Sequence, residues 1–310
     1  MRIYISIPSW KNEKSLEILR QKAEVVVADK RPTQSEFRDI IHEYDGAIIG
    51  RLHSIDKEVL ENSKLKFVGL TARGTDNIDI DECKKKNVAV FYTPEANITS
   101  VAEHVMTLVL SLSKNLVKLD RSVREEQFDE YRYSTIEIKD KILGVIGAGS
   151  IAREVIKRAN SFDMKIICYT PHPEKHKSLK VEFVPLADLL KNSDFVSVNI
   201  PLTKNTENFI DIKELSMMKE SSFLINTSRG KIVNEKALID ALKNNKLAGA
   251  GIDVFEEEPT HNKELFSLDN VILSPHVAGV SKEALNRMEE QVIGDIIAFL
   301  DDKKPKYRLV

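Results

Sequence analysis

Short apolar runs alternate with amphipathic stretches along most of the chain, a pattern typical of βα units and a parallel sheet. In the N-terminal third, the runs that predict strands are Ile3–Ile7, Glu24–Val27, Ala47–Ile49, Phe67–Leu70 and Val88–Phe91. Helical patterns lie between them, for example at Lys14–Lys22 and Lys57–Asn62. These elements are enough for a small α/β domain.

A second series of strands begins after a helical stretch at Ser100–Leu119. Its six apolar runs are Ile142–Gly147, Lys165–Tyr169, Phe195–Asn199, Ser222–Asn226, Ala248–Ile252 and Val271–Leu273. Parallel strands at this spacing predict a doubly wound sheet of the kind that binds dinucleotides. The last helix, predicted at Lys282–Leu300, has a pattern that allows it to pack on either domain.

Length and charge narrow the class of protein. The chain has 310 residues, which suits about two domains. It contains 46 Lys plus Arg and 48 Asp plus Glu, a formal charge of −2. Because binding to nucleic acid or to an anionic membrane surface needs an excess of basic residues, we expect neither partner.

Cysteine content and hydropathy point to a cytoplasmic protein without a membrane segment. Cys83 and Cys168 are too few for a disulfide framework or a four-ligand zinc site, so we expect no metal centre. The longest apolar stretch, at 105–112, is interrupted by Thr107 and Ser111 and falls short of the ~20 residues of a membrane span. The segment 1–7 alternates like a first strand and lacks the features of a signal peptide.

A glycine motif directly follows the first strand of the second series. Gly147 and Gly149, followed by Ser150 and Ile151, lead to the small residue Ala152 and open a helical stretch. The first glycine permits a tight turn, the second lets backbone N–H groups approach a pyrophosphate, and the small residue allows helix and strand to pack. The motif predicts a dinucleotide site; the alternative is a plain tight turn.

The end of the next strand bears on which dinucleotide binds. A carboxylate that would hold the adenosine ribose of NAD is expected about 20 residues after the motif, but Thr170 stands at this strand end. The basic residues His172, Lys175 and His176 follow. A neutral residue followed by basic ones favours the 2′-phosphate of NADP(H), with NAD(H) still open. The alternative is a solvated basic loop without a ligand.

Three polar segments follow successive strands of the second series. They are Asn226–Gly230, Asp253–Pro259 and Ser274–Gly279. Ligands bind at the carboxyl ends of parallel strands, so an Arg, a carboxylate and a His from these segments can form one site. Taken singly, His276, Glu258 and Arg229 are as easily structural or surface residues.

These motifs, together with Gly74–Asp79, Ser100–His104 and Pro201–Thr203, resemble those of the D-isomer-specific 2-hydroxyacid dehydrogenases over nearly the whole chain. The resemblance implies an α/β fold with two Rossmann-like domains: a flavodoxin-like substrate domain at 1–98 plus 282–310, and a doubly wound NAD(P)-binding domain at 99–281. It also implies hydride transfer between NAD(P)H and a 2-oxo acid of the glyoxylate, hydroxypyruvate or 3-phosphoglycerate type.

The resemblance assigns the catalytic roles. His276 would exchange a proton with the substrate oxygen, and a carboxylate at Glu258 would accept its other ring N–H, orient the ring and favour its charged form. Arg229 would bind the substrate carboxylate with its planar guanidinium. Two alternatives remain: an NAD(P)-sensing corepressor-like protein, and an enzyme that uses a bound NAD internally.

Further roles are implied around this centre. Ala72, Arg73 and Gly74 would bind the substrate carboxylate, and Asn97 would face the substrate. Asp253 would hold the nicotinamide carboxamide. The alternatives are that Asn97 only forms a turn and that Asp253 only ends a strand. Further cofactor contacts would come from Pro201, Thr203 and Thr227.

The resemblance also implies a homodimer. Its interface would involve the helix at Ser100–Leu119, which carries the apolar residues Val101, Val105, Leu108, Val109 and Leu112. The alternative is that these residues pack within one subunit.

Overall fold

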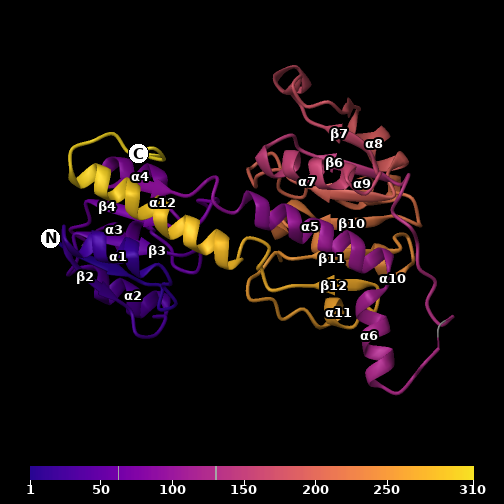
Figure 1. Cartoon of the computed structure of the whole chain (residues 1–310), viewed down its shortest axis with the longest axis horizontal. Helices are drawn as coiled ribbons and strands as arrows, with labels where there is room; N and C mark the ends of the chain where they lie inside the picture. Colours follow the sequence, from indigo (N-terminus) through magenta and orange to yellow (C-terminus); the bar gives the residue numbers. More distant parts are fainter. Residues whose placement is uncertain (62, 130) are drawn as a thin grey trace. The chain divides into compact units, whose positions relative to one another are not determined.

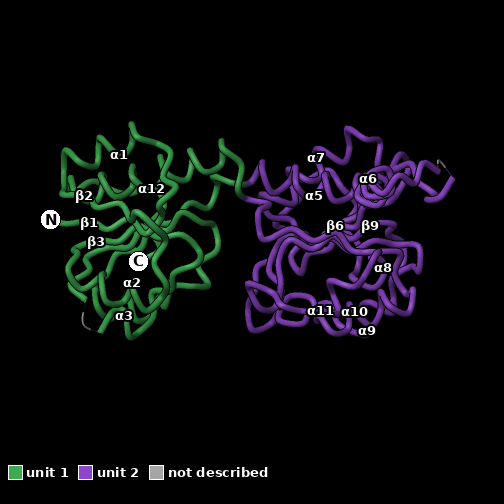
Figure 2. Tube along the Cα trace, turned by 90° about the horizontal axis from the view of Figure 1, so that it is seen from below, with its two compact units in different colours: residues 1–97, 280–310 green, residues 98–279 purple. Residues whose placement is uncertain are grey.

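The chain divides into two compact units. The computed structural model describes residues 1–61, 63–129 and 131–310. Unit 1 comprises residues 1–97 and 280–310, and unit 2 comprises residues 98–279 (Figure 2). The chain therefore passes between the units twice. Its C-terminal segment belongs to the same unit as its N-terminal segment.

Unit 1 contains a parallel sheet of five strands in the order β2-β1-β3-β4-β5 (Figure 1). This is the strand order of flavodoxin-like folds and confirms the predicted fold class. The strands are β1 (Arg2–Ile5), β2 (Glu24–Val27), β3 (Gly46–Ile49), β4 (Phe67–Leu70) and β5 (Ala89–Tyr92).

Helices cover both faces of this sheet because successive residues of each buried strand point to opposite sides. One face packs on α1 (Glu13–Arg20) and α12 (Lys282–Leu300), the other on α2 (Gln34–Ile41), α3 (Lys57–Glu61) and α4 (Ile80–Lys85). Helix α12 approaches β4 so closely that a Cβ at Gly69 would lie 2.6 Å from the side chain of Val292. Of the helix predicted at 57–62, Asn62 lies outside the described residues.

Unit 2 contains a parallel sheet of seven strands in the order β12-β11-β10-β9-β6-β7-β8. The strands are β6 (Ile142–Ile146), β7 (Lys165–Tyr169), β8 (Glu182–Phe183), β9 (Phe195–Val198), β10 (Phe223–Asn226), β11 (Gly249–Ile252) and β12 (Val271–Leu273). The order reverses beside β6, which confirms the doubly wound sheet. Strand β8 was not predicted, because two residues form no recognisable apolar run.

The helices of unit 2 lie in two layers (Figure 2). Helices α5 (Ile98–Ser113) and α7 (Ser150–Asn160) cover one face of the sheet. The other face is covered by α8 (Leu186–Asn192), α9 (Ile212–Met217), α10 (Glu235–Lys243) and α11 (Lys263–Phe266). No helix in the described ranges is long and apolar enough to cross a membrane.

The single helix predicted at Ser100–Leu119 is wrong. Helix α5 ends at Ser113, and a separate helix α6 (Leu116–Arg124) follows. Asn115 between them has a left-handed backbone with φ of 48°, a conformation that Asn tolerates better than most residues and that ends a helix.

The predicted interface face of this helix is also buried within the chain. Its five apolar residues are at most 7% exposed: Val101, Val105, Leu108, Val109 and Leu112. All of them except Val101 belong to the core that α5 forms with the sheet and α7. This face of the helix therefore packs within one subunit, as the alternative to an interface had it.

Candidate active site

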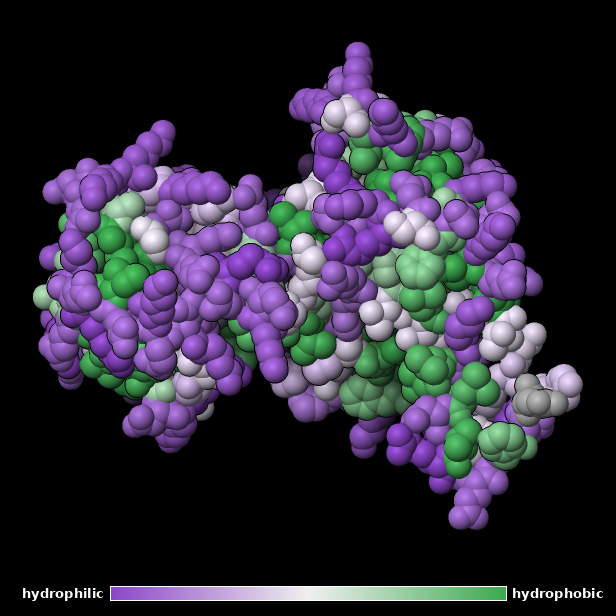
Figure 3. All heavy atoms as spheres, viewed as in Figure 1, coloured by the Kyte–Doolittle hydropathy of each residue, from purple (hydrophilic) through white to green (hydrophobic). Residues whose placement is uncertain are grey.

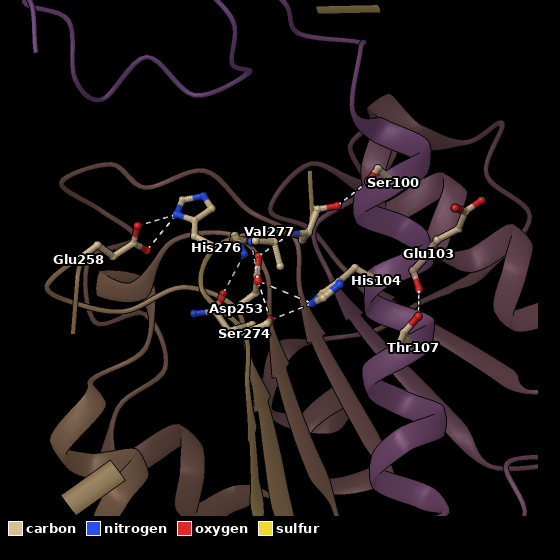
Figure 4. Close-up of polar contacts among 12 residues, drawn as sticks. Ser100, Glu103, His104, Thr107, Asp253, Glu258, Ser274, His276 and Val277 are labelled. Carbon is tan, nitrogen blue, oxygen red and sulfur yellow. Dashed lines mark hydrogen bonds and ion pairs between the residues drawn. The ribbon is translucent and has the colours of Figure 1, made fainter. Parts of the chain in front are cut away.

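Two residues from neighbouring loops of unit 2 form a histidine–carboxylate pair (Figure 4). The Nδ1 atom of His276 lies 2.7 Å from Oε2 and 2.9 Å from Oε1 of Glu258. His276 follows β12, and Glu258 lies in the loop after β11. The Glu258 carboxylate also accepts the backbone N–H of Phe255 at 3.2 Å, which fixes its direction. The ring therefore uses Nδ1 for the carboxylate and presents Nε2 on its other side.

The neighbouring Glu256 has a different partner. The Glu256 carboxylate accepts the backbone N–H of Glu235 at 2.8 Å, on the side of α10. Of the Glu256–Glu258 run, Glu258 is thus the residue that the structure brings to His276, as the sequence comparison had selected.

Arg229 lies in the turn after β10, and this turn packs against the Glu258 loop. A Cβ at Gly230 would lie 1.9 Å from the carbonyl carbon of Phe255, so only glycine allows this approach. The side chain of Asn226 holds the turn: its Nδ2 donates to the carbonyl of Arg229 at 3.0 Å, and its Oδ1 accepts the N–H of Ser228 at 3.0 Å. One arm of the Arg229 guanidinium donates to the carbonyl of Ser228 at 2.7 Å.

His276 has an unusual backbone conformation, and Asp253 supports it. The φ angle of His276 is 54°, in the left-handed region that non-glycine residues rarely occupy. The carboxylate of Asp253, which is completely buried, accepts the N–H groups of Val277 and Ala278 at 2.9 Å each. The residue predicted to hold the cofactor's carboxamide is therefore engaged with the loop that carries His276.

Three residues without a predicted role complete this network. The hydroxyl of Ser274 donates to Asp253 at 2.6 Å, and Nε2 of His104 lies 2.9 Å from the same hydroxyl (Figure 4). The hydroxyl of Ser100 donates to the carbonyl of Ala278 at 2.8 Å. His104 and Ser100 lie in a segment that supported the resemblance, but nothing in the sequence pointed to their partners.

The glycine motif forms a turn that fits a dinucleotide pyrophosphate. Gly147 has a φ of 105°, and a Cβ there would lie 2.5 Å from the carbonyl oxygen of Asn199. At Gly149, which begins α7, a Cβ would meet nothing within 4 Å, so the space before the helix N-terminus is open. Ser150 and Ile151 open α7, whose N-terminal N–H groups and dipole attract a phosphate.

A buried thiol contacts the same turn. The Sγ of Cys168 lies 3.4 Å from the carbonyl oxygen of Gly147. Burial raises the pKa of this thiol to about 12, so it stays protonated and acts as a weak donor to the glycine turn.

A basic loop follows β7, and an arginine of α7 that had no predicted role reaches it. Arg153, in the first turns of α7, donates to Nδ1 of His176 at 3.1 Å and to the hydroxyl of Ser178 at 3.3 Å. Because a guanidinium only donates, His176 accepts at Nδ1. In contrast, Nδ1 of His172 lies 3.4 Å from the carboxylate of Glu174. The backbone N–H of His172 donates to the Thr170 hydroxyl at 3.4 Å.

The remaining predicted cofactor residues lie in two loops at the same sheet edge. Pro201 and Thr203 follow β9, in a turn closed by the hydroxyl of Thr206, which donates to the Pro201 carbonyl at 2.7 Å. Thr227 follows β10 and is 9% exposed.

The predicted substrate residues Ala72, Arg73, Gly74 and Asn97 belong to unit 1. The loop after β4 is joined to the loop after β5: the Ala72 carbonyl accepts the N–H of Thr93 at 3.1 Å, and Arg73 donates to the carbonyl of Pro94. The Oδ1 atom of Asn97 is buried and has no hydrogen-bond partner among the described residues. His276, Glu258 and Arg229 all belong to unit 2.

Comparisons with known proteins show the family of the chain. Residues 106–278 match the family model of the D-isomer specific 2-hydroxyacid dehydrogenase NAD-binding domain. A glyoxylate reductase of Thermococcus litoralis is 40% identical over 286 residues, covering 89% of this chain and 86% of the relative.

Two solved structures show the same fold. The D-lactate dehydrogenase of Aquifex aeolicus, complexed with NAD and lactic acid, has a TM-score of 0.86 at 30% identity and covers 97% of this chain and 96% of its own. An acyclic imino acid reductase complexed with NADPH and D-Arg has a TM-score of 0.90 at 30% identity, with both chains fully covered. The chain therefore belongs to the D-isomer specific 2-hydroxyacid dehydrogenases, oxidoreductases that transfer a hydride between a nicotinamide dinucleotide and a 2-oxo or 2-hydroxy acid.

Proposed function

We propose that this enzyme reduces a small 2-oxo acid such as glyoxylate or hydroxypyruvate to the corresponding 2-hydroxy acid, with the D configuration where the product is chiral. In this proposal unit 2 binds the dinucleotide, and unit 1 supplies further substrate contacts. The observation that carries the proposal is the Glu258–His276 pair, which lies in the same unit as the glycine turn. A protein that only senses a dinucleotide has no need for an imidazole held at Nδ1.

The pair defines how a proton would move. A carboxylate at Nδ1 requires a hydrogen on that atom, so the proton that is exchanged resides on Nε2. Bound NAD(P)H supplies the hydride. During reduction the charged ring donates the Nε2 proton to the substrate's carbonyl oxygen, and Glu258 stabilises the charge that the ring carries beforehand. In the oxidative direction, Nε2 of the neutral ring takes the hydroxyl proton.

Arg229 and unit 1 would recognise the rest of the substrate. The guanidinium matches a carboxylate with two parallel N–H groups and can polarise the adjacent carbonyl, which Lys does less well. Backbone N–H groups of Ala72–Gly74 would contact the same carboxylate. The buried Oδ1 of Asn97, which has no hydrogen-bond partner in the described ranges, suits a donor such as a substrate hydroxyl.

Net consumption of NADPH or NADH tests the activity. We expect turnover with glyoxylate and hydroxypyruvate, and slower turnover with pyruvate, phenylpyruvate and phosphohydroxypyruvate, measured by absorbance loss of the reduced cofactor. Saturable cofactor binding without turnover of any of these acids would instead support a sensor. An enzyme that recycles a bound NAD would show no net consumption either.

Glu258→Gln tests the pair. Removing the carboxylate removes the acceptor that holds the ring by Nδ1 and the negative charge beside it. The value of kcat for reduction should therefore fall roughly tenfold or more. Glu257→Gln is the matched control, because Glu257 is exposed. A kcat of Glu258→Gln equal to that of the control would contradict the pairing.

We further propose NADP(H) as the preferred cofactor. In support, Thr170 leaves the end of β7 without a carboxylate, and Arg153 lies over the loop that follows, with its guanidinium against His176 and Ser178. Lys175 is exposed on the same loop. These donors suit the 2′-phosphate. The relatives do not decide the matter, since one was solved with NADPH and another with NAD.

Arg153→Ala should therefore weaken the binding of NADPH and leave the binding of NADH almost unchanged. A charge-assisted hydrogen bond is worth about 1.5–3 kcal/mol, so KM for NADPH should rise at least about tenfold while KM for NADH changes little. Lys157→Ala on the exposed side of α7 is the control. A wild-type preference for NADH above tenfold, or equal effects on both cofactors, would refute the proposed role.

We propose that the homodimer forms through α6 and the segment that follows it. Leu116, Val117 and Val123 are more than half exposed, and Phe128 and Tyr131 are 90% and 87% exposed. Apolar atoms gather over α6 in Figure 3. An exposed apolar patch of this kind favours burial against a second copy related by a twofold axis, because each copy then covers the other's patch.

Light scattering after size-exclusion chromatography tests this surface. The wild-type chain should elute with about twice the monomer mass of 35.1 kDa, and the double variant Leu116→Asp/Val123→Asp as a monomer. Ile212→Asp is the control, since Ile212 on α9 is also 72% exposed. A dimer that survives the double variant but dissociates with Ile212→Asp would place the interface elsewhere.

A further inference from the structure

We propose that helix α5 braces the loop that carries His276, with His104 and Ser100 as positioning residues and Asp253 as the link between them and the loop. The inference rests on the proposed function, in which His276 exchanges the proton. It assigns to Asp253 a role different from the carboxamide contact implied by resemblance.

The carboxylate of Asp253 is committed to the loop. One oxygen accepts both the N–H of Val277 and the hydroxyl of Ser274, and the other accepts the N–H of Ala278. The side chain has no exposed surface. These bonds hold the residues just after His276, whose left-handed backbone needs such support to persist. Asp253 therefore fixes the backbone of His276, while Glu258 fixes its ring.

The direction of the hydrogen bonds assigns a donor role to His104. The hydroxyl of Ser274 has one hydrogen, and the 2.6 Å contact commits it to the Asp253 carboxylate. Ser274 must then accept from His104, so Nε2 of His104 carries a hydrogen. The same Nε2 lies 3.6 Å from the nearer Asp253 oxygen. His104 thus orients the hydroxyl and supplies positive potential beside a buried anion.

Ser100 holds the loop on its other side. Its hydroxyl donates to the carbonyl of Ala278, whose N–H is held by Asp253, so both polar groups of this residue are fixed. In the sequence, the two bonded residues lie close to the places where the chain enters unit 2, at 97/98, and leaves it, at 279/280. Helix α5 and the His276 loop are therefore joined near the points where the chain enters and leaves unit 2. Figure 4 shows the contacts that Ser100 and His104 of this helix make with the loop.

Amide hydrogen exchange of the segment 274–280 tests the brace directly and does not depend on turnover. In His104→Ala and in Ser100→Ala, we expect the amides of Val277 and Ala278 to exchange at least about tenfold faster. The value of kcat should fall roughly tenfold, because a small displacement of a catalytic group is costly. His104→Gln retains an N–H donor and should recover most of both losses. Thr107→Ala is the control, since Thr107 lies on α5 and its hydroxyl donates within its own helix, to the carbonyl of Glu103.

The outcomes separate the brace from a general loss of stability. Unchanged exchange of these amides in both Ala variants would overturn the brace. Faster exchange with unchanged kcat would overturn the positioning role. If the wild-type chain reduces no 2-oxo acid, the proposed function fails, while the exchange measurement still reports on the brace.

Asp253→Asn distinguishes the two roles of Asp253. The amide replaces one accepting oxygen with a donor that faces a backbone N–H, so the brace predicts faster exchange and roughly a hundredfold lower kcat with an unchanged Kd for NADPH. A Kd for NADPH weakened more than tenfold, with normal exchange of Val277 and Ala278, would assign Asp253 to the cofactor instead. Binding is measured by the fluorescence of the reduced nicotinamide.

Discussion

The hydrogen bond between Glu258 and Nδ1 of His276 is the constraint on which the chemistry of the site depends. An imidazole can carry its exchangeable proton on either nitrogen, and a free ring would distribute it between them. The carboxylate at 2.7 Å settles the choice. Once Nδ1 keeps its hydrogen, only Nε2 is left to exchange a proton. In the proposed function, a single ring can then serve reduction when charged and oxidation when neutral, without rotating.

The parallel sheet brings the partners together because neighbouring strands end at the same level. In the register of the sheet, Asn226 pairs with Ile252 and Ile252 with Leu273. The residues that follow these three positions therefore emerge side by side, although they are far apart in the sequence. Close packing then holds the loops: Gly230 lets one loop lie against the next, and Asp253 binds the loop after β12.

The sequence was sufficient for the elements whose signals are local. Apolar runs located the strands of both sheets to within about two residues, and the glycine spacing located the phosphate turn, because backbone sterics dictate both. The resemblance then selected His276, Glu258 and Arg229. The break at Asn115 was missed because one left-handed residue leaves the apolar period almost intact. Strand β8 was missed because its two residues pair only through β7.

The contacts around the centre had no such local signal. His104 and Ser274 are separated by 170 positions and meet only because α5 packs on the face of the sheet beside β10 and β11. A Ser or His in one helix gives no indication of a partner on a strand end so far along the chain. Residues of this kind can be identified only in the folded structure. Because buried polar groups need hydrogen-bond partners, each donor and acceptor can be followed there to the residue that it contacts.

In the basic loop after β7, the hydrogen-bond partners change which side chains can attract a phosphate. From sequence, His172, Lys175 and His176 together made the loop attractive to a phosphate. In the structure, His176 accepts from the Arg153 guanidinium and so contributes orientation, while His172 lies beside the Glu174 carboxylate. The side chains that offer positive charge to a ligand at this place are therefore Arg153, whose guanidinium reaches the loop from α7, and the exposed Lys175.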